Sequence, residues 1–231
     1  MSVQIPLDLG SVASYAAADF LVSECNRAAR DLVSGWRAWP NRAAAIWGAA
    51  GAGKTHLAEV WRADAAAAAL DLEGFLSLDL ARVEDPVRFV LDLGGETLPA
   101  EGERPLFHLL NTVRERAGAL LIVARAAPAR WQAALPDLVS RLRALPAAEV
   151  GQPDDALFGA VLKKHFQDRQ LAVDDETVDY LVLRSERSFA AAEALAARLD
   201  QEALARRRNI TIPLARIVLA DIEDEASADG A

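Results

Sequence analysis

One short stretch constrains this chain more than any other. Residues 48–55, Gly-Ala-Ala-Gly-Ala-Gly-Lys-Thr, fit the phosphate-binding pattern G-x-x-x-x-G-K-[ST] at every fixed position. Glycine lacks a Cβ, so such a loop can turn tightly and direct its N–H groups at phosphate oxygens. We expect Lys54 to reach the β- and γ-phosphates and Thr55 to offer its hydroxyl to Mg²⁺. The expected nucleotide-binding residues of this loop are Gly48, Ala49, Ala50, Gly51, Ala52, Gly53, Lys54, Thr55 and His56.

The residues on either side of the loop support this interpretation. Residues 43–47 are a short apolar run typical of a buried strand, and residues 55–63 have the pattern of a helix. Phosphate would then lie at the N-terminus of that helix, where the helix dipole is positive. The sequence therefore predicts a nucleotide site that takes ADP or ATP together with Mg²⁺.

Composition excludes several classes of protein. The 231 residues are 52 % hydrophobic, with a formal net charge of −9, which argues against a broad non-specific grip on nucleic acid. The basic run 206–208 is interpreted as a solvated helix end. A single cysteine, Cys25, excludes an internal disulfide and fits a reducing compartment. With neither a signal peptide nor an apolar run of about 20 residues, we expect a soluble, cytoplasmic protein without a membrane partner.

Apolar runs alternate with helical patterns beyond the loop. We expect further strands at 74–79, 88–92, 120–123 and 147–150. Helices are expected at 26–35 and 106–116, and one or two helices broken at Pro136 are expected within 128–145. This alternation favours right-handed crossovers and an α/β fold with a mostly parallel, five-stranded sheet. Because ligands bind at the carboxyl ends of such strands, Asp92 at the end of the third strand is a candidate magnesium residue.

The pattern contains only helices after Gly151. The expected helices are 153–170, 174–184, 188–206 and 211–221. We therefore expect an α/β domain at 19–151, a small all-helical domain at 152–222 and an acidic, disordered tail at 223–231.

The N-terminal segment, residues 1–18, differs from the rest. Gln4 to Leu9 places Ile5, Leu7 and Leu9 on one face of an extended segment, and small residues follow as a tether. Spacing alone leaves two interpretations open: an edge strand, and a linear motif that docks in a partner's groove.

An α/β P-loop domain followed by a helical lid resembles the AAA+ proteins. In that resemblance Asp92 is the Walker B aspartate, Arg141 in Ser-Arg-Leu is the arginine finger, and Arg187 is the sensor 2 arginine that contacts nucleotide. A planar, permanently charged guanidinium suits both roles because it can hold phosphate through two parallel hydrogen bonds. Either arginine taken alone would be interpreted as part of a surface ion pair.

Within AAA+ the chain resembles the Hda family of DnaA-related proteins. The likeness runs from Gln4 to about Ala220, and the chain ends before the DNA-binding domain of DnaA, so no sequence-specific DNA binding is expected. It is carried by residues 19–22, 26–29, 48–57, 107–111, 135–142, 153–155, 168–171 and 186–189.

This resemblance implies two partners and one activity. Gln4, Ile5, Leu7 and Leu9 are similar to the family's peptide for the β sliding clamp of DNA polymerase, with isoleucine in place of one leucine. The second implied partner is DnaA, whose bound ATP would be hydrolysed with the help of Arg141, limiting re-initiation of replication. Whether the chain also forms homo-oligomers is left open.

Two departures from the AAA+ pattern bear on hydrolysis by the chain itself. Leu93 occupies the place of the acid that orients water, and Val123 and Ala124 occupy the polar sensor 1 place, with Arg125 the first polar group. We therefore expect nucleotide binding with weak or no ATPase activity, because positioning the attacking water contributes much of the rate. The alternative is an independent AAA+ ATPase of the helicase-loader or DnaA-like type.

Overall fold

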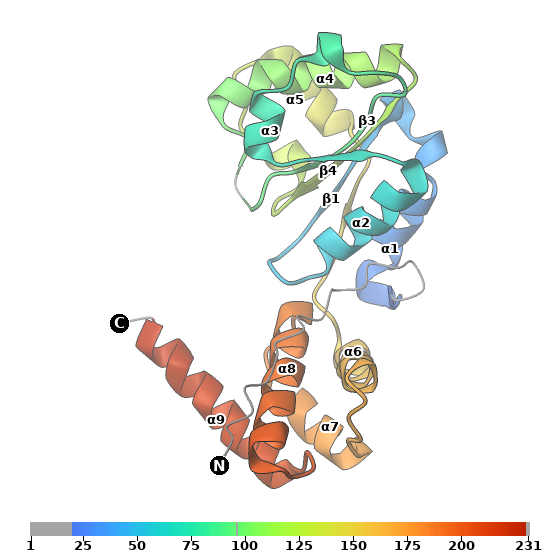
Figure 1. Cartoon of the computed structure of the whole chain (residues 1–231). Helices are drawn as coiled ribbons and strands as arrows, with labels where there is room; N and C mark the ends of the chain where they lie inside the picture. Colours follow the sequence, from blue (N-terminus) through green and yellow to red (C-terminus); the bar gives the residue numbers. More distant parts are fainter. Residues whose placement is uncertain (1–19, 96, 230–231) are drawn as a thin grey trace.

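The computed structural model describes residues 20–95 and 97–229. The four expected clamp-binding residues, Gln4, Ile5, Leu7 and Leu9, lie outside these ranges. Figure 1 shows a sheet with helices on both faces, and a separate group of helices formed by the C-terminal part of the chain.

The sheet has five strands, all paired in parallel. They are β1 (Ala43–Trp47), β2 (Ala68–Leu70), β3 (Arg88–Asp92), β4 (Ala119–Ala124) and β5 (Ala147–Glu149), in the order β2-β3-β4-β1-β5. Strand β4 is central, and all six of its residues are buried. The predicted five-stranded parallel sheet is confirmed.

Alternate strand residues pack against helices on opposite faces, as a period of two requires. On one face Ile46 and Leu121 pack with residues of α1 (Glu24–Ser34) and α2 (Lys54–Ala65). On the other, Ala45 and Leu120 pack with residues of three further helices. These helices are α3 (Leu72–Leu76), α4 (Glu103–Glu115) and α5 (Pro136–Ala144). Short 3₁₀ turns occupy Trp36–Ala38, Pro40–Arg42, Leu80–Arg82, Ala100–Gly102 and Pro128–Arg130.

The second strand lies elsewhere than predicted. Residues 74–79, expected to form a strand, are partly in α3, and the strand is the preceding alanine-rich segment β2. Asp71 begins the helix by accepting a hydrogen bond from the Gly74 N–H at 2.8 Å, and Phe75 anchors it in the core. Alanine has little strand preference of its own, so β2 forms because it pairs with β3.

Three tryptophans belong to the core of the α/β part. Trp36, Trp39 and Trp61 are buried between α1, the turns that follow it and α2. The rings of Trp39 and Trp61 are stacked with centroids 5.3 Å apart, and Trp36 meets Trp61 edge to face.

The C-terminal helices form their own core, which confirms the predicted helical lid. They are α6 (Asp155–Asp168), α7 (Asp175–Val182), α8 (Phe189–Arg206) and α9 (Ile212–Asp229). Asp154, Asp174 and Ser188 cap the first three by accepting hydrogen bonds from backbone N–H groups. None of the helices within residues 20–95 and 97–229 is both long and apolar enough to cross a membrane.

Helix α9 differs from the expected disordered tail at 223–231. It continues to Asp229, and Glu225 forms an ion pair with Arg198 of α8. The side chains of Val218 and Leu219, in the preceding part of α9, are buried. The helix has therefore already formed where the acidic segment begins, and adding further turns to it costs little. The domain limits at 19–151 and 152–222 stay predictions.

Candidate nucleotide site

The predicted phosphate loop connects β1 to the N-terminus of α2. Gly53 has φ 91° at the N-cap of α2, a conformation that favours glycine. A Cβ on Gly53 would lie 3.2 Å from the Phe189 ring, and one on Gly48 would lie 2.2 Å from the Val150 carbonyl oxygen. The loop therefore has room for its backbone only, which is what a backbone cradle for phosphate needs.

Lys54 is the first residue of α2, and its ammonium lies over the loop. Nζ donates to the carbonyl oxygens of Gly48 and Ala49, at 2.9 and 2.7 Å. Burial lowers the pKa of Lys54, Asp92 opposes that shift and Arg125 adds to it. The carboxylate at the end of β3 and the guanidinium after β4 thus both act on the phosphate-loop lysine, at the carboxyl ends of the strands.

The donor set fits a magnesium ion that is shared with phosphate. Asp92 ends β3, and its Oδ1 accepts a hydrogen bond from the Gly94 N–H at 2.9 Å. Thr55 is an exposed residue in the first turn of α2. In the described part of the chain no three His, Cys, Asp or Glu side chains gather as a metal site. One hydroxyl and one carboxylate suit Mg²⁺, which keeps several waters and takes further ligands from phosphates.

The lid touches the phosphate loop through the start of α8. The Phe189 N–H donates to the Gly51 carbonyl oxygen at 2.8 Å, and Ser188 packs against Gly51. Arg187, immediately before them, does not extend into the loop. Its Nε donates to Oδ1 of Asp155, the first residue of α6, at 2.6 Å. The structure thus brings the residues next to Arg187 to the loop, while the guanidinium is held within the lid.

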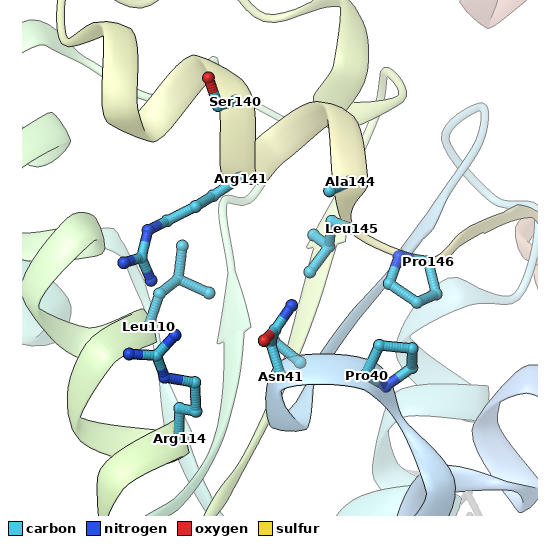
Figure 2. A pocket seen from close by; sticks show the side chains of 10 residues that line it. Pro40, Asn41, Leu110, Arg114, Ser140, Arg141, Ala144, Leu145 and Pro146 are labelled. Atoms are coloured by element: carbon cyan, nitrogen blue, oxygen red, sulfur yellow. The ribbon is translucent and has the colours of Figure 1, made fainter.

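Arg141 lies at the opposite end of the sheet from its own phosphate loop. It lines a surface pocket of about 270 Å³ that also contains Ala43, the first residue of β1, whereas the loop follows Trp47, the last (Figure 2). The Arg141 guanidinium carbon lies 4.7 Å from the centre of the Phe107 ring of α4. Arg141 is therefore separated from the other predicted site residues.

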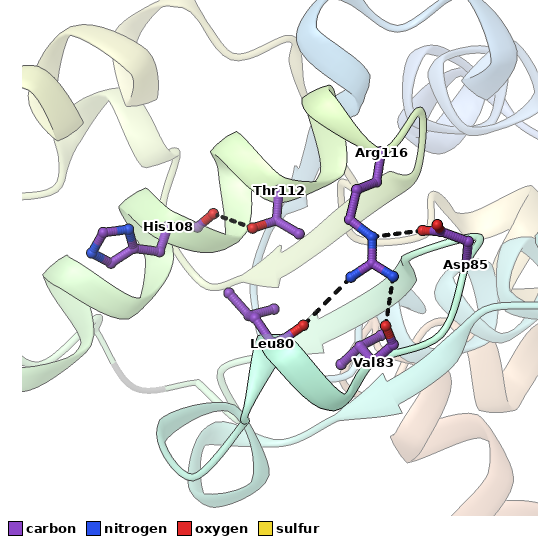
Figure 3. Close-up of polar contacts among 6 residues, drawn as sticks. All are labelled: Leu80, Val83, Asp85, His108, Thr112 and Arg116. Atoms are coloured by element: carbon purple, nitrogen blue, oxygen red, sulfur yellow. Dashed lines mark hydrogen bonds and ion pairs between the residues drawn. The ribbon is translucent and has the colours of Figure 1, made fainter.

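Arg116, directly after α4, anchors the segment that leads into β3 and so to Asp92. Its guanidinium donates to Oδ1 of Asp85 at 2.6 Å and to the carbonyl oxygens of Leu80 and Val83 (Figure 3). One cation thus satisfies three acceptors of an otherwise irregular connection.

The sequence pattern did not predict three contacts of this site. The Phe189 ring lies against Gly53, and the Arg125 guanidinium lies over Gly95. The third contact is the hydrogen bond that Arg187 donates to Asp155. The AAA+ resemblance indicated Arg187 as a sensor 2 arginine, but nothing in the sequence indicated that Asp155 would be its partner.

Comparisons with known proteins agree with this architecture. Residues 155–219 match the lid domain of Hda. An uncharacterized protein of Haemophilus influenzae is 27 % identical over 188 residues, which cover 75 % of this chain and 80 % of that protein.

Solved structures show the same fold at low sequence identity. Domain III of the replication initiation protein DnaA from Thermotoga maritima matches with a TM-score of 0.73 and 17 % identity, covering 95 % of this chain and 98 % of that one. AMPPCP-bound DnaA from Aquifex aeolicus gives 0.68 and 18 %, over 84 % and 67 % of the two chains. The RuvB branch migration motor of Thermotoga maritima gives 0.65 and 14 %, over 90 % and 72 %. Residues 155–219 are thus a lid domain of the Hda type, and the chain as a whole has the AAA+ fold seen in the DnaA structures.

Proposed function

We propose that this protein is a regulatory inactivator of DnaA. It binds a nucleotide, with ADP favoured, and Mg²⁺ at the phosphate loop. It binds the DNA-loaded sliding clamp through Gln4, Ile5, Leu7 and Leu9. In this proposal it promotes hydrolysis of the ATP bound to DnaA and thereby limits re-initiation.

The position of Arg141 is the observation that carries the proposal. A guanidinium at the end of β1 away from its own phosphate loop cannot serve that loop's nucleotide, but it can enter the site of a neighbouring molecule. An arginine supplied in this way accelerates hydrolysis by roughly 10³–10⁵ in P-loop proteins, because it stabilises charge on the transferred phosphate.

The site's own hydrolysis should be weak. Leu93 occupies the place of the water-orienting acid and is 1 % exposed. It packs in the core between the sheet and helices α3, α4 and α5. Val123 and Ala124 at the end of β4 are also buried and apolar. Neither position offers a group that could hold an attacking water, so a bound nucleotide would persist.

Hydrolysis of DnaA-bound ATP tests the proposal. Wild-type protein, Arg141→Ala and Arg141→Lys are added to ATP–DnaA with the clamp loaded on DNA. The alanine variant should lose most of the stimulation, and lysine should rescue poorly because it lacks the planar fork. Arg143→Ala, an exposed arginine on the same helix, is the matched control. No stimulation by the wild type, or full stimulation by Arg141→Ala, would refute the assignment.

The alternative, an independent AAA+ ATPase of the helicase-loader or DnaA-like type, shares this fold. It predicts steady ATP turnover by the purified chain in the absence of DnaA and the clamp. A turnover rate at the level of working P-loop ATPases would favour it over the regulatory proposal.

A further inference from the structure

Arg125 lies next to the phosphate loop, because Ala124 before it accepts a hydrogen bond from the Gly48 N–H at 3.2 Å. It is the first residue after β4, the strand that lies between β1, which leads to the loop, and β3, which ends at Asp92. Its side chain is exposed. The carboxyl ends of these three strands meet at the edge where ligands of parallel sheets bind.

The guanidinium of Arg125 lies over the turn that follows Asp92. A Cβ on Gly95 would be 2.3 Å from Nε and 2.8 Å from Cζ of Arg125, so the guanidinium rests on backbone that only glycine leaves open. Gly95 has φ 96°, which also favours glycine. The Arg125 side chain therefore packs on the turn that directly follows Asp92, the Walker B aspartate.

The charged side chains at the carboxyl ends of β1, β3 and β4 favour the binding of an anion there. None of the ion pairs formed within residues 20–95 and 97–229 includes Arg125. Lys54 and Arg125 bring two cations to the carboxyl ends of β1 and β4, where a bound phosphate chain would offset their mutual repulsion.

We propose that Arg125 is a second phosphate-binding cation of this nucleotide site and acts together with Lys54. The inference rests on the proposed nucleotide binding and adds a residue to it. A guanidinium can donate two parallel hydrogen bonds to phosphate oxygens, which a lysine cannot do. Arg125 would thereby raise the affinity of the site for the diphosphate of ADP, in a site that lacks the groups for hydrolysis.

Calorimetric titration of the nucleotide-free, full-length protein with ADP and Mg²⁺ tests this role. Losing one charge-assisted hydrogen-bonding group should raise the Kd for ADP by about tenfold or more in Arg125→Ala. Arg125→Lys should recover part of the affinity, and Arg125→Glu should lose more than alanine. Arg130→Glu, an exposed arginine in the following turn, makes the same change of charge away from the loop and should bind like the wild type.

The outcomes separate this inference from the proposed function. Unchanged ADP affinity in a folded Arg125→Ala, or equal losses in Arg125→Glu and Arg130→Glu, would overturn the role of Arg125. A wild-type protein that binds neither ADP nor ATP would refute nucleotide binding itself. Thermal unfolding of each variant checks the fold, which an exposed side chain should leave intact.

Discussion

The guanidinium carbon of Arg141 lies 4.7 Å from the centre of the Phe107 ring, so that α5 and α4 meet through a cation–π contact. Such a contact at a partly exposed position contributes about 0.5–1 kcal/mol and restricts where a flexible arginine points. Phe107 therefore holds in place the side chain to which we assign the effect on DnaA.

Replacing Phe107 by leucine should lower stimulation of DnaA by roughly two- to fivefold, since apolar volume is kept while the ring is lost. In the Arg141→Ala background the same change should have no further effect, because the two residues act as one unit. Glu115→Ala, an exposed residue at the far end of α4, is the control. Full stimulation by Phe107→Leu, or losses that add in the double variant, would contradict a positioning role.

Clamp binding should depend on the N-terminal peptide. A variant with Gln4, Leu7 and Leu9 all changed to alanine loses a polar anchor and two apolar side chains. Each buried leucine is worth about 1.5–3 kcal/mol, so a micromolar complex should become undetectable by surface plasmon resonance. Asp8→Ala, which leaves all four proposed clamp-binding residues in place, should bind normally, and both variants should retain ADP affinity. A triple variant that still binds the clamp would favour the edge-strand interpretation.

The ion pair between Asp155 and Arg187 should compete with nucleotide. The hydrogen bond from Arg187 keeps the pKa of Asp155 below its ordinary value, so the carboxylate remains charged and paired at neutral pH. Asp155→Asn should release the guanidinium and raise ADP affinity by up to about threefold, since exposed pairs contribute little. The same change in an Arg187→Ala background should do nothing. Equal gains in both backgrounds would exclude a contact of Arg187 with phosphate.

Patterns with a strict physical cause were predictable from the sequence. The phosphate loop needs glycine at fixed places, and β3 and β4 are apolar because helices cover both faces of a parallel sheet. Strand β2 was missed because its residues, Ala68, Ala69 and Leu70, carry no strand signal, and pairing with β3 decides its conformation.

The contacts that complete the site depend on tertiary structure. Arg125 and Gly95 meet because β4 lies beside β3, and Asp155 and Arg187 meet because α6 lies beside α8. Residues 30 or more positions apart were brought together by strand order and helix packing, which no local pattern encodes.

His165 should make the stability of the lid depend on pH. Burial in α6 lowers the pKa of His165 from its ordinary 6.5, with Arg169 adding to the shift. Among the other charged neighbours, Lys164 acts in the same direction, and Glu193 and Asp168 oppose it. The unfolded chain therefore binds a proton at His165 more readily than the folded chain does.

The sign follows from this difference in proton binding. Between the lowered pKa and 6.5 the unfolded state holds more protons, so the free energy of unfolding falls as pH drops below about 6.5, with a slope of at most about 1.4 kcal/mol per pH unit. Urea unfolding at pH 7.5, 6.5 and 5.5 should show this loss in the wild type and in His108→Gln, and a smaller loss in His165→Gln. Equal losses in all three proteins would mean that the pH dependence arises from other groups.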